Sequence, residues 1–472
     1  MNIKYTKKLI LLLSFLLFAF VLPDGASGQN FEQRKRIEEE KRTKLQATEN
    51  KILAEEDRLL IEWGGWIDMR YDQYNEDDND ASLKDAFAAT SSLDTRIWVQ
   101  VILQSAADDP DPHQHSLYLR AKNIATITSP EDVNVTYDNA GPHLDQGYVV
   151  LDYRPWEFEF GRRYFSVGQG IAYGNVHDGF EANATFSDWN LKSFFAHTLP
   201  HEDNIDVRAP GALKKSDRSF YGLEMRYIGF MGHGIYGYGV VQRDSSNEDP
   251  INFTQDFTYD SEYLGLGLQG KLLPQMFYWA EVMHQSGESH IFGSNDKRHV
   301  KAWAGDFGTT YNWDVYSHPS FTVEYAFGTG DADRVNVTDT QFGNTLGQDN
   351  NFLHFGYLPT GFALAPRLSN IHMYRAGVLL KPLENIDRFR NLSFGLDYYH
   401  FLKYENAGGI SDLDATVTDK DIGDEINVSV AWQFLSDATL TLQYGYFIAG
   451  DAFADPADDS ETYFSTDLTL IF

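Results

Sequence analysis

Residues 93–104 have the sequence LDTRIWVQVILQ, in which the character of the side chains alternates from one residue to the next. One parity is apolar or β-branched and consists of Leu93, Thr95, Ile97, Val99, Val101 and Leu103. The other is mostly polar and consists of Asp94, Arg96, Trp98, Gln100 and Gln104. Because successive side chains of a strand point to opposite faces, the stretch predicts a β-strand with one apolar and one polar face. A soluble sandwich and a transmembrane barrel both contain such strands.

The same alternation returns along the rest of the chain, for example at 320–328 and 425–434. Most of these segments are close to the roughly 9–11 residues with which a tilted strand crosses a bilayer. From residue 60 onward we predict about 18 strands, at 60–74, 92–104, 116–125, 146–154, 157–166, 179–186, 188–197, 219–228, 233–242, 262–272, 275–287, 299–311, 319–328, 371–381, 392–403, 425–434, 438–447 and 463–472.

The connections between these strands sort by length. After every second strand the connection is mostly short, as at 155–156, 187, 273–274 and 435–437, whereas the others are longer and reach 329–370. Short turns on one side and long loops on the other are typical of outer-membrane barrels, which must also close because lipid cannot hydrogen-bond a free edge. The terminal Phe472 of an alternating strand resembles the signal read by the outer-membrane assembly machinery. We therefore predict an all-β fold, a transmembrane antiparallel β-barrel over 60–472.

The N-terminal part has a different character. Three lysines precede an apolar run at 9–22, and the small residues of 26–28 follow, which predicts a secretory signal peptide at 1–28; an uncleaved anchor helix is the alternative. Residues 29–59 are rich in Glu, Lys and Arg with a thin apolar stripe and are interpreted as a short periplasmic helix or tether. The alternative is a docking segment, over 30–59, for a periplasmic scaffold protein.

Composition excludes several function classes. The chain has no cysteine, so disulfides and thiol chemistry are excluded, and its net charge of −31 argues against nucleic acid as a partner. Because no hydrolase, metalloprotease or nucleotide-binding motif occurs, we expect a channel without a cofactor rather than an enzyme. Outer-membrane lipid and lipopolysaccharide are the expected surroundings. Acidic loops could bind Ca²⁺, and Asp331 and Asp333 are the best single candidates.

Parity assigns side chains to the lumen of the predicted barrel. The basic set is Arg70, Arg96, Arg120, Lys122, Arg154, Arg163, Lys192, Arg226 and Arg375. The acidic set is Asp68, Asp94, Asp152, Glu157, Glu159, Glu181, Glu224, Glu281, Asp306, Glu324 and Asp397. The sub-cluster of Arg96, Arg120, Lys122 and Arg163 would concentrate anions, or else pair with carboxylates of the wall.

Aromatic side chains divide by parity in the same way. Trp66, Trp98 and Phe194 are predicted to point inward, where they could stack on sugar rings or simply fill space. Tyr236, Tyr238, Tyr444 and Tyr446 are predicted on the lipid face, as part of an interfacial girdle.

Four motifs, in order, resemble segments of the alginate-export outer-membrane porins. They are GRRYFSVGQGIAYGN (161–175), NNFLHFGYLPTGFALAPRLSNIHMYRAGVLLKP (350–382), FGLDYYHFLKY (394–404), and IGDEINVSVAWQF with LTLQYGYFIAGDAF (422–453). The resemblance spans roughly residues 61–472. It implies a monomeric 18-stranded pore that passes an anionic polysaccharide such as alginate through an Arg-lined constriction. By motif position, Arg162 or Arg163, Arg367 and Arg375 would belong to that passage, and parity adds Arg96, Arg120, Lys122 and Arg226.

Two features depart from this family pattern. The predicted lumen carries many carboxylates, and the chain as a whole is strongly negative, with a net charge of −31. The charged segment at 29–59 has no counterpart among the family's motifs. The alternative function is therefore a general or nutrient-selective porin for small solutes or oligosaccharides.

Overall fold

The fold is that of a computed structural model. It describes residues 51–53, 59–75, 88–105, 113–130, 135–200, 202, 204–205, 215–230, 232–246, 258–291, 294, 296–334, 336–338, 344–345, 347–454 and 460–472. The predicted signal peptide and nearly all of the predicted periplasmic helix lie outside these residues. Within 29–59 the structure describes Lys51–Leu53, which form the short strand β1, and Leu59, where β2 begins. Strand β1 pairs with the start of β2, so a helix is wrong for these three residues.

The described residues form a barrel of eighteen long strands, each paired with its neighbour in antiparallel register. The alternation of lipid-facing and water-facing positions explains why the sequence forms strands here and not helices. All the predicted strands are present. Their bounds are β2 (Leu59–Tyr74), β3 (Ala88–Gln104), β4 (Gln114–Pro130), β5 (Thr136–Tyr153), β6 (Trp156–Ser166), β7 (Gly174–Phe186), β8 (Trp189–His197), β9 (Arg218–Phe230), β10 (His233–Asp244), β11 (Asp260–Leu273), β12 (Met276–His290), β13 (Lys297–Asn312), β14 (Ser320–Gly328), β15 (Ile371–Leu380), β16 (Leu392–Lys403), β17 (Asp421–Leu435), β18 (Ala438–Ala449) and β19 (Glu461–Ile471).

The last strand closes the barrel on the first. Strand β19 pairs with β2 from Tyr463 opposite Tyr74 to Ile471 opposite Trp66. The chain end continues this ladder, because Gly65 and Phe472 exchange two backbone hydrogen bonds of 3.0 Å. Closure satisfies the backbone groups that an open edge would expose to lipid.

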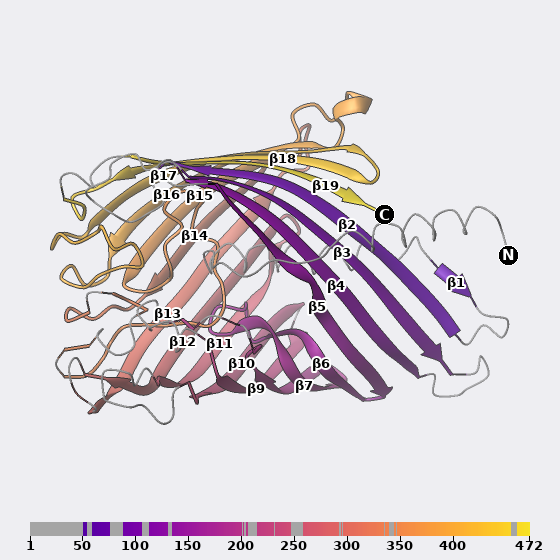
Figure 1. The fold of residues 1–472 in the computed structure, drawn as a ribbon, viewed down its shortest axis with the longest axis horizontal. Coiled ribbons are helices and arrows are strands. Elements are labelled where there is room, and N and C mark those ends of the chain that lie inside the picture. The colour runs from indigo at the N-terminus through magenta and orange to yellow at the C-terminus, as the bar shows by residue number, and fades with distance from the viewer. Residues whose placement is uncertain are drawn as a thin grey trace.

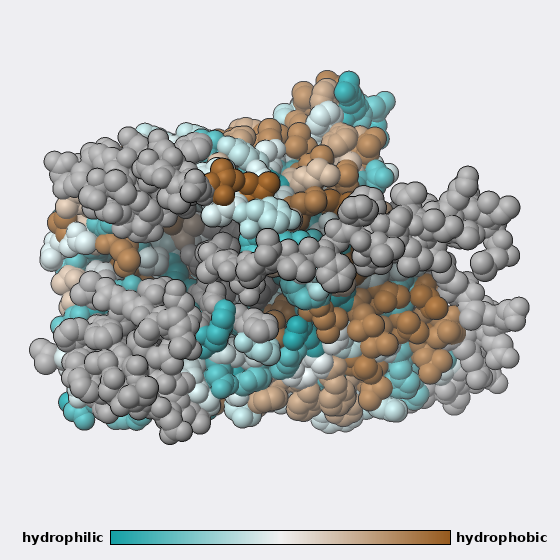
Figure 2. Space-filling model, viewed as in Figure 1, coloured by the Kyte–Doolittle hydropathy of each residue, from teal (hydrophilic) through white to brown (hydrophobic). Residues whose placement is uncertain are grey.

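The outer wall and the lumen have opposite chemistry, as the alternation predicts. Many large apolar side chains point outward and remain exposed, whereas most of the buried charged side chains of the strands point inward. Figure 2 shows apolar side chains gathered on the outer wall toward the end that carries the termini. Among the described residues, no helix is long and apolar enough to cross a membrane. The short 3-10 helix η3 (Asp387–Phe389) lies in the connection between β15 and β16.

The two ends of the barrel differ (Figure 1). At the end with the termini, several connections are short, as at 154–155, 187–188, 231–232, 274–275 and 436–437. The opposite end carries the long connections, including 329–370. The predicted sorting is confirmed, with one difference: β4 and β5 are longer than predicted and leave only 131–135 between them.

The contribution of barrel closure to stability can be tested at Gly65, which pairs with the last residue of the chain. A Cβ added to Gly65 would lie 2.5 Å from the Phe472 ring and would also meet the Arg96 carbonyl oxygen. Because the Arg96 carbonyl oxygen belongs to the backbone of the paired strand β3 and cannot move aside like a side chain, we expect Gly65→Val to lower stability by about 1–3 kcal/mol. Heat-modifiability on gels would show a lower unfolding temperature. Gly239→Val is the matched control, since a Cβ there meets only a carbonyl oxygen at 3.8 Å. Equal unfolding temperatures for the two variants would mean that the close contact at Gly65 does not contribute to stability.

Candidate functional site: a lumen narrowed by two inserted loops

A short loop, residues 167–173 between β6 and β7, folds into the lumen. Its backbone N–H groups donate to carboxylates in the middle of distant strands: Gly168 to Glu224 of β9 at 2.7 Å, and Gln169 to Glu281 of β12 at 2.8 Å. Gly168 has φ +54°, and a Cβ there would lie 2.6 Å from a Glu281 carboxylate oxygen and from the Tyr238 ring. Glycine is therefore required at this close approach.

The hydroxyl groups of Tyr236 and Tyr238 also donate to Glu281, at 2.5 and 2.8 Å. Both tyrosines are buried inside the barrel, so their predicted place on the lipid face is wrong. The reason lies in β10, whose outward positions include Gly237 and Gly239 and whose rings consequently occupy the inward parity. Tyr444 and Tyr446 are exposed on the outer face, as predicted.

The long loop, residues 329–370 between β14 and β15, also folds into the lumen, and part of it lies against β17, the second strand beyond β15 in the sheet. Glu425 of β17 accepts three consecutive backbone N–H groups of this loop, from Phe362 at 2.5 Å, Ala363 at 3.1 Å and Leu364 at 3.0 Å. Gly361 has φ +115° and packs against the same carboxylate. Glu425 therefore fixes the part of the long loop that we call the tip, residues 360–366.

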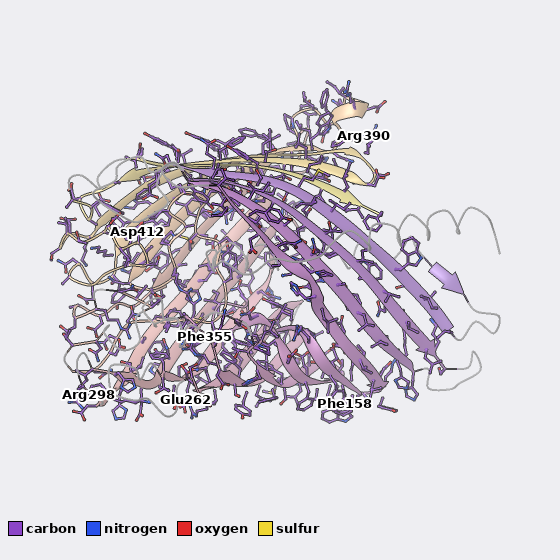
Figure 3. All side chains as sticks on the ribbon, in the orientation of Figure 1. Phe158, Glu262, Arg298, Phe355, Arg390 and Asp412 are labelled. Carbon is purple, nitrogen blue, oxygen red and sulfur yellow. The ribbon has the colours of Figure 1, made fainter. Side chains whose placement is uncertain are left out.

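The two loops are joined to each other. Tyr357 donates its backbone N–H to Gly170 at 2.9 Å, and Phe355 donates to Ala172 at 3.0 Å. Phe355 also lies against Phe220 of the wall and, in Figure 3, within the outline of the barrel. The joined loops are anchored on β9, β12 and β17, and together they narrow the lumen.

Ion pairs and hydrogen bonds hold the root of the long loop. Arg334 and Asp349 form a buried ion pair of 2.6 Å. The Asp331 carboxylate accepts the backbone N–H groups of Asp333 and Asn350 at 2.9 and 2.8 Å. In the described part of the chain, no group of three acidic, histidine or cysteine side chains is arranged to hold a metal ion. Asp331 therefore acts as a brace for the loop, and the expectation of a Ca²⁺ site gains no support from it.

A positive charge lies inside the folded long loop at Arg367. Its guanidinium donates to the His354 carbonyl oxygen at 2.8 Å, and its Nε is buried without a hydrogen-bond partner among the described residues. Burial lowers the pKa of Arg367 to about 10, so the group stays protonated at neutral pH. Burial, reinforced by Arg367, lowers the pKa of His354 to about 3 and keeps that imidazole neutral.

Three of the predicted basic residues meet at one carboxylate, Asp145 of β5. Arg120 lies 2.6 Å, Arg96 3.0 Å and Lys122 3.8 Å from its oxygens. Asp145 is the extra residue of a β-bulge, since Gln146 faces Arg120 and Leu144 faces the next residue of β4. A second carboxylate, Asp94, pairs with Arg96 at 2.8 Å. We call these five side chains the cationic cluster.

The predicted inward tryptophans belong to the same wall. Trp66 is buried, and the guanidinium carbons of Arg120 and Arg96 lie 5.4 and 5.8 Å from its ring centroid. Trp98 is buried and stacks on Tyr118 with ring centroids 6.0 Å apart. The guanidinium groups beside Trp66 are placed for cation–π contact. Sugar stacking by either ring stays a prediction.

Apart from Arg367, the other predicted basic residues are dispersed, and each has a carboxylate partner. Arg163 pairs with Glu159 at 2.6 Å and Glu181 at 3.2 Å, away from the cationic cluster with which it was grouped. The remaining pairs are Arg226 with Glu224 at 3.0 Å, Arg375 with Asp397 at 2.8 Å and Glu324 at 3.0 Å, Arg162 with Asp178 at 2.8 Å, Arg70 with Asp72 at 2.9 Å, Lys192 with Glu224 at 3.6 Å and Arg154 with Asp152 at 3.7 Å. Arg162 has the opposite parity to Arg163 and lies on the outer face, so Arg163 is the lumen member of that motif.

Sequence reasoning missed the roles of four acidic residues. Asp145 fell just before a predicted strand, and its inward direction depends on a bulge. Glu224 and Glu281 were predicted to be in the lumen, but their use as loop anchors was not, and Glu425 appeared only as part of an alternating strand. For Glu224 and Glu281, a signal that could have revealed their role is the glycine-rich run 168–174, since such a run suits backbone that approaches other groups closely.

The geometry defines a class of protein. A closed barrel with an apolar outside, a polar lumen and loops folded into that lumen is an outer-membrane channel. The sequence model described as "Alginate export" matches residues 144–467. The chain belongs to the alginate export family and is a channel of the outer membrane. The family resemblance and the barrel expected from the sequence are both confirmed.

Solved structures share the fold. OccAB1 of Acinetobacter baumannii is similar with a TM-score of 0.55 and 10% identity, over 90% of this chain and 99% of that chain. OccK8 (OprE) of Pseudomonas aeruginosa has a TM-score of 0.52 and 12% identity, over 87% and 98%. OccK7 (OpdD) of the same organism has a TM-score of 0.51 and 9% identity, over 87% and 98%. A comparison with curated proteins finds no match.

Proposed function

We propose that this channel passes an anionic polysaccharide, such as alginate, through its lumen. The observation that carries the proposal is the cationic cluster, in which Arg96, Arg120 and Lys122 surround the carboxylate of Asp145. The buried Arg96 and Arg120 hold this carboxylate through charge-assisted hydrogen bonds, and a uronate carboxylate offers the same chemistry. Family membership and the protonated Arg367 in the long loop support the same substrate class.

The mixture of basic and acidic side chains in the lumen is compatible with the passage of an anionic polysaccharide. The basic side chains of the candidate set that face the lumen from the strands each have a carboxylate partner within the protein, so a uronate carboxylate would exchange with that partner rather than bind an unsatisfied cation. Exchange keeps each binding step weak, and conduction requires binding that is favourable at several sites but strong at none. The carboxylates Glu224, Glu281 and Glu425 also have a separate role, since they accept backbone N–H groups of the inserted loops.

One observation favours the alternative of a general or nutrient-selective porin. The wall formed by β12–β14 carries Glu281, Asp306 and Glu324, and all three are buried on the lumen side. An acidic stretch of this kind would favour cations or neutral solutes over a polyanion. The two functions predict opposite ion selectivity.

Ion selectivity in planar bilayers tests the proposal. We expect the wild-type channel to prefer anions and its current to be blocked by oligouronates. Because Arg96 and Arg120 supply the two closest contacts to Asp145, the double change Arg96→Gln and Arg120→Gln should weaken the block about 10-fold, which corresponds to roughly 1.4 kcal/mol. Arg390→Gln, in the exposed turn after η3, is the control. Cation preference without an oligouronate block would instead indicate the general porin.

A further inference from the structure

The direction of β1 indicates where the chain before it lies. Strand β1 lies beside the start of β2 at the terminus-bearing end of the barrel (Figure 1), along the edge of β2 that β19 leaves free. The pairing is antiparallel and places Lys51 opposite Glu62, so the chain before Lys51 comes from the direction of the middle of the barrel. Phe472 already occupies the place opposite Gly65. The chain before Lys51 can therefore follow β2 for only two further residues and must then leave the sheet.

The composition of that chain favours the lumen over the outside of the barrel. Residues 29–50 lie outside the described residues, and eleven of these 22 residues are charged. On the outside, the wall at this level is apolar, and the side chains of Leu103 and Leu117 are exposed there. Charged side chains are costly in lipid and almost always face a protein interior or a water-filled cavity. The lumen offers both water and charged partners.

The lumen side of β2–β4, which we call the docking face, is covered from within the barrel. Trp66, Trp98 and Tyr118 point into the lumen from these three strands, yet each is at most 2% exposed. The carboxylate anchors of the two inserted loops lie elsewhere, on β9, β12 and β17. Rings that only line a wide lumen would keep an open face toward it. Their burial is what a segment packed in front of the docking face would produce.

The charges of residues 29–50 match those of the docking face in order. From the terminus-bearing end, the face presents Glu62 and then the cationic cluster at the level of Trp66, about 14 Å further along β2. From residue 50 backward, the segment presents a basic stretch at 41–44 and then three glutamates at 38–40. As the helix that the sequence predicts, the stretch from residue 50 to residue 40 rises about 15 Å. This rise brings the glutamates to the height of the cationic cluster.

From these features we infer that residues 29–50 bind the docking face as an internal plug, in which the glutamates at 38–40 meet Arg96, Arg120 and Lys122. These three cations outnumber Asp94 and Asp145, so the cationic cluster has a net positive charge that favours a further carboxylate. The inference rests on the proposed function in one respect, because it places the plug at the site that the polysaccharide would use. The plug occupies this site with its own carboxylates until the polysaccharide displaces it.

Disulfide cross-linking of the full chain tests the position of the plug. The chain has no cysteine, so the double variant Glu39→Cys and Lys122→Cys contains a single possible pair. We expect mild oxidation to join this pair at a yield at least about 10-fold above that of a control pair, since a disulfide requires Cα atoms within about 7 Å. The control combines Glu39→Cys with Thr310→Cys, which lies on the lumen side of β13 on the opposite side of the barrel from β4.

Single-channel conductance tests whether the plug obstructs the channel. Deletion of residues 31–48, which leaves the predicted cleavage site and β1 in place, should raise the conductance several-fold. The triple change Glu38→Gln, Glu39→Gln and Glu40→Gln should also raise it, because it removes the charges that face the cationic cluster. Its control is Glu55→Gln with Glu56→Gln, between β1 and β2 in the sequence, which should conduct like the wild type.

These two measurements separate the plug from the substrate. The plug is overturned if the two cysteine pairs cross-link equally, if the deletion leaves the conductance unchanged, or if the triple change conducts like its control. Heat-modifiability confirms that each variant is folded. Because neither measurement involves a polysaccharide, a current that oligouronates fail to block, in the deletion variant as well as in the wild type, would overturn the proposed function alone.

Discussion

Replacement of Asp145 by asparagine is expected to increase the anion preference of the channel several-fold and to destabilise the barrel. The carboxylate is shared by Arg96, Arg120 and Lys122, and asparagine keeps its shape while removing its charge. For an ion that passes about 10 Å away, one unit charge contributes roughly 0.4–1.7 kcal/mol, which changes the partition of that ion by about 2- to 15-fold. The negative charge of Asp145 lowers the energy of a passing cation and raises that of a passing anion. Its removal therefore shifts the selectivity toward anions.

The same substitution leaves two buried guanidinium groups with fewer carboxylate contacts. Removal of one partner from a buried ion pair typically costs about 3–5 kcal/mol, so the unfolding temperature should fall. Reversal potentials in a salt gradient measure the selectivity, and heat-modifiability measures the stability. Asp387→Asn, at an exposed position in η3, makes the same charge change outside the lumen and should alter neither. An unchanged reversal potential for Asp145→Asn would mean that passing ions do not approach the cationic cluster.

The strands could be predicted from sequence because lipid imposes a simple rule on one face. Wherever an outward side chain faces lipid, it is apolar, and the alternation is visible, as at 93–104. The prediction fails where a strand leaves the bilayer. Strand β5 begins at Thr136, ten residues before the predicted start, because both of its faces meet polar surroundings there and the alternation disappears.

The positions of lumen side chains could be predicted in part, but their partners could not. Parity indicates the side of the wall to which a residue belongs, and it places Arg96 and Arg120 correctly. It fails at Asp145, where a bulge changes the register, and at Tyr236, where glycines occupy the lipid face. Contacts such as that between Glu425 and the long loop join residues more than 60 positions apart, and strand periodicity carries no information about them.

Replacement of Glu425 by alanine is expected to release the tip of the long loop and to raise the single-channel conductance. The carboxylate accepts the backbone N–H groups of Phe362, Ala363 and Leu364, and hydrogen bonds to a charged group each contribute about 1.5–3 kcal/mol. A loss of about 3 kcal/mol in total already changes the ratio of docked to undocked tip by roughly 100-fold. The root of the loop stays in place, because Arg334 and Asp349 hold it independently.

The variant Glu425→Gln shows whether the hydrogen bonds of Glu425 to the loop or its negative charge controls the conductance. Glutamine removes the negative charge but keeps an oxygen that accepts the loop N–H groups, so its conductance should lie much closer to that of the wild type than to that of Glu425→Ala. Single-channel recordings should also show more frequent transitions for the alanine variant, because an undocked tip moves through the lumen. If both variants raise the conductance equally, the charge of Glu425 and not its hold on the loop controls the current. If neither does, the tip of the long loop does not limit the conducting path.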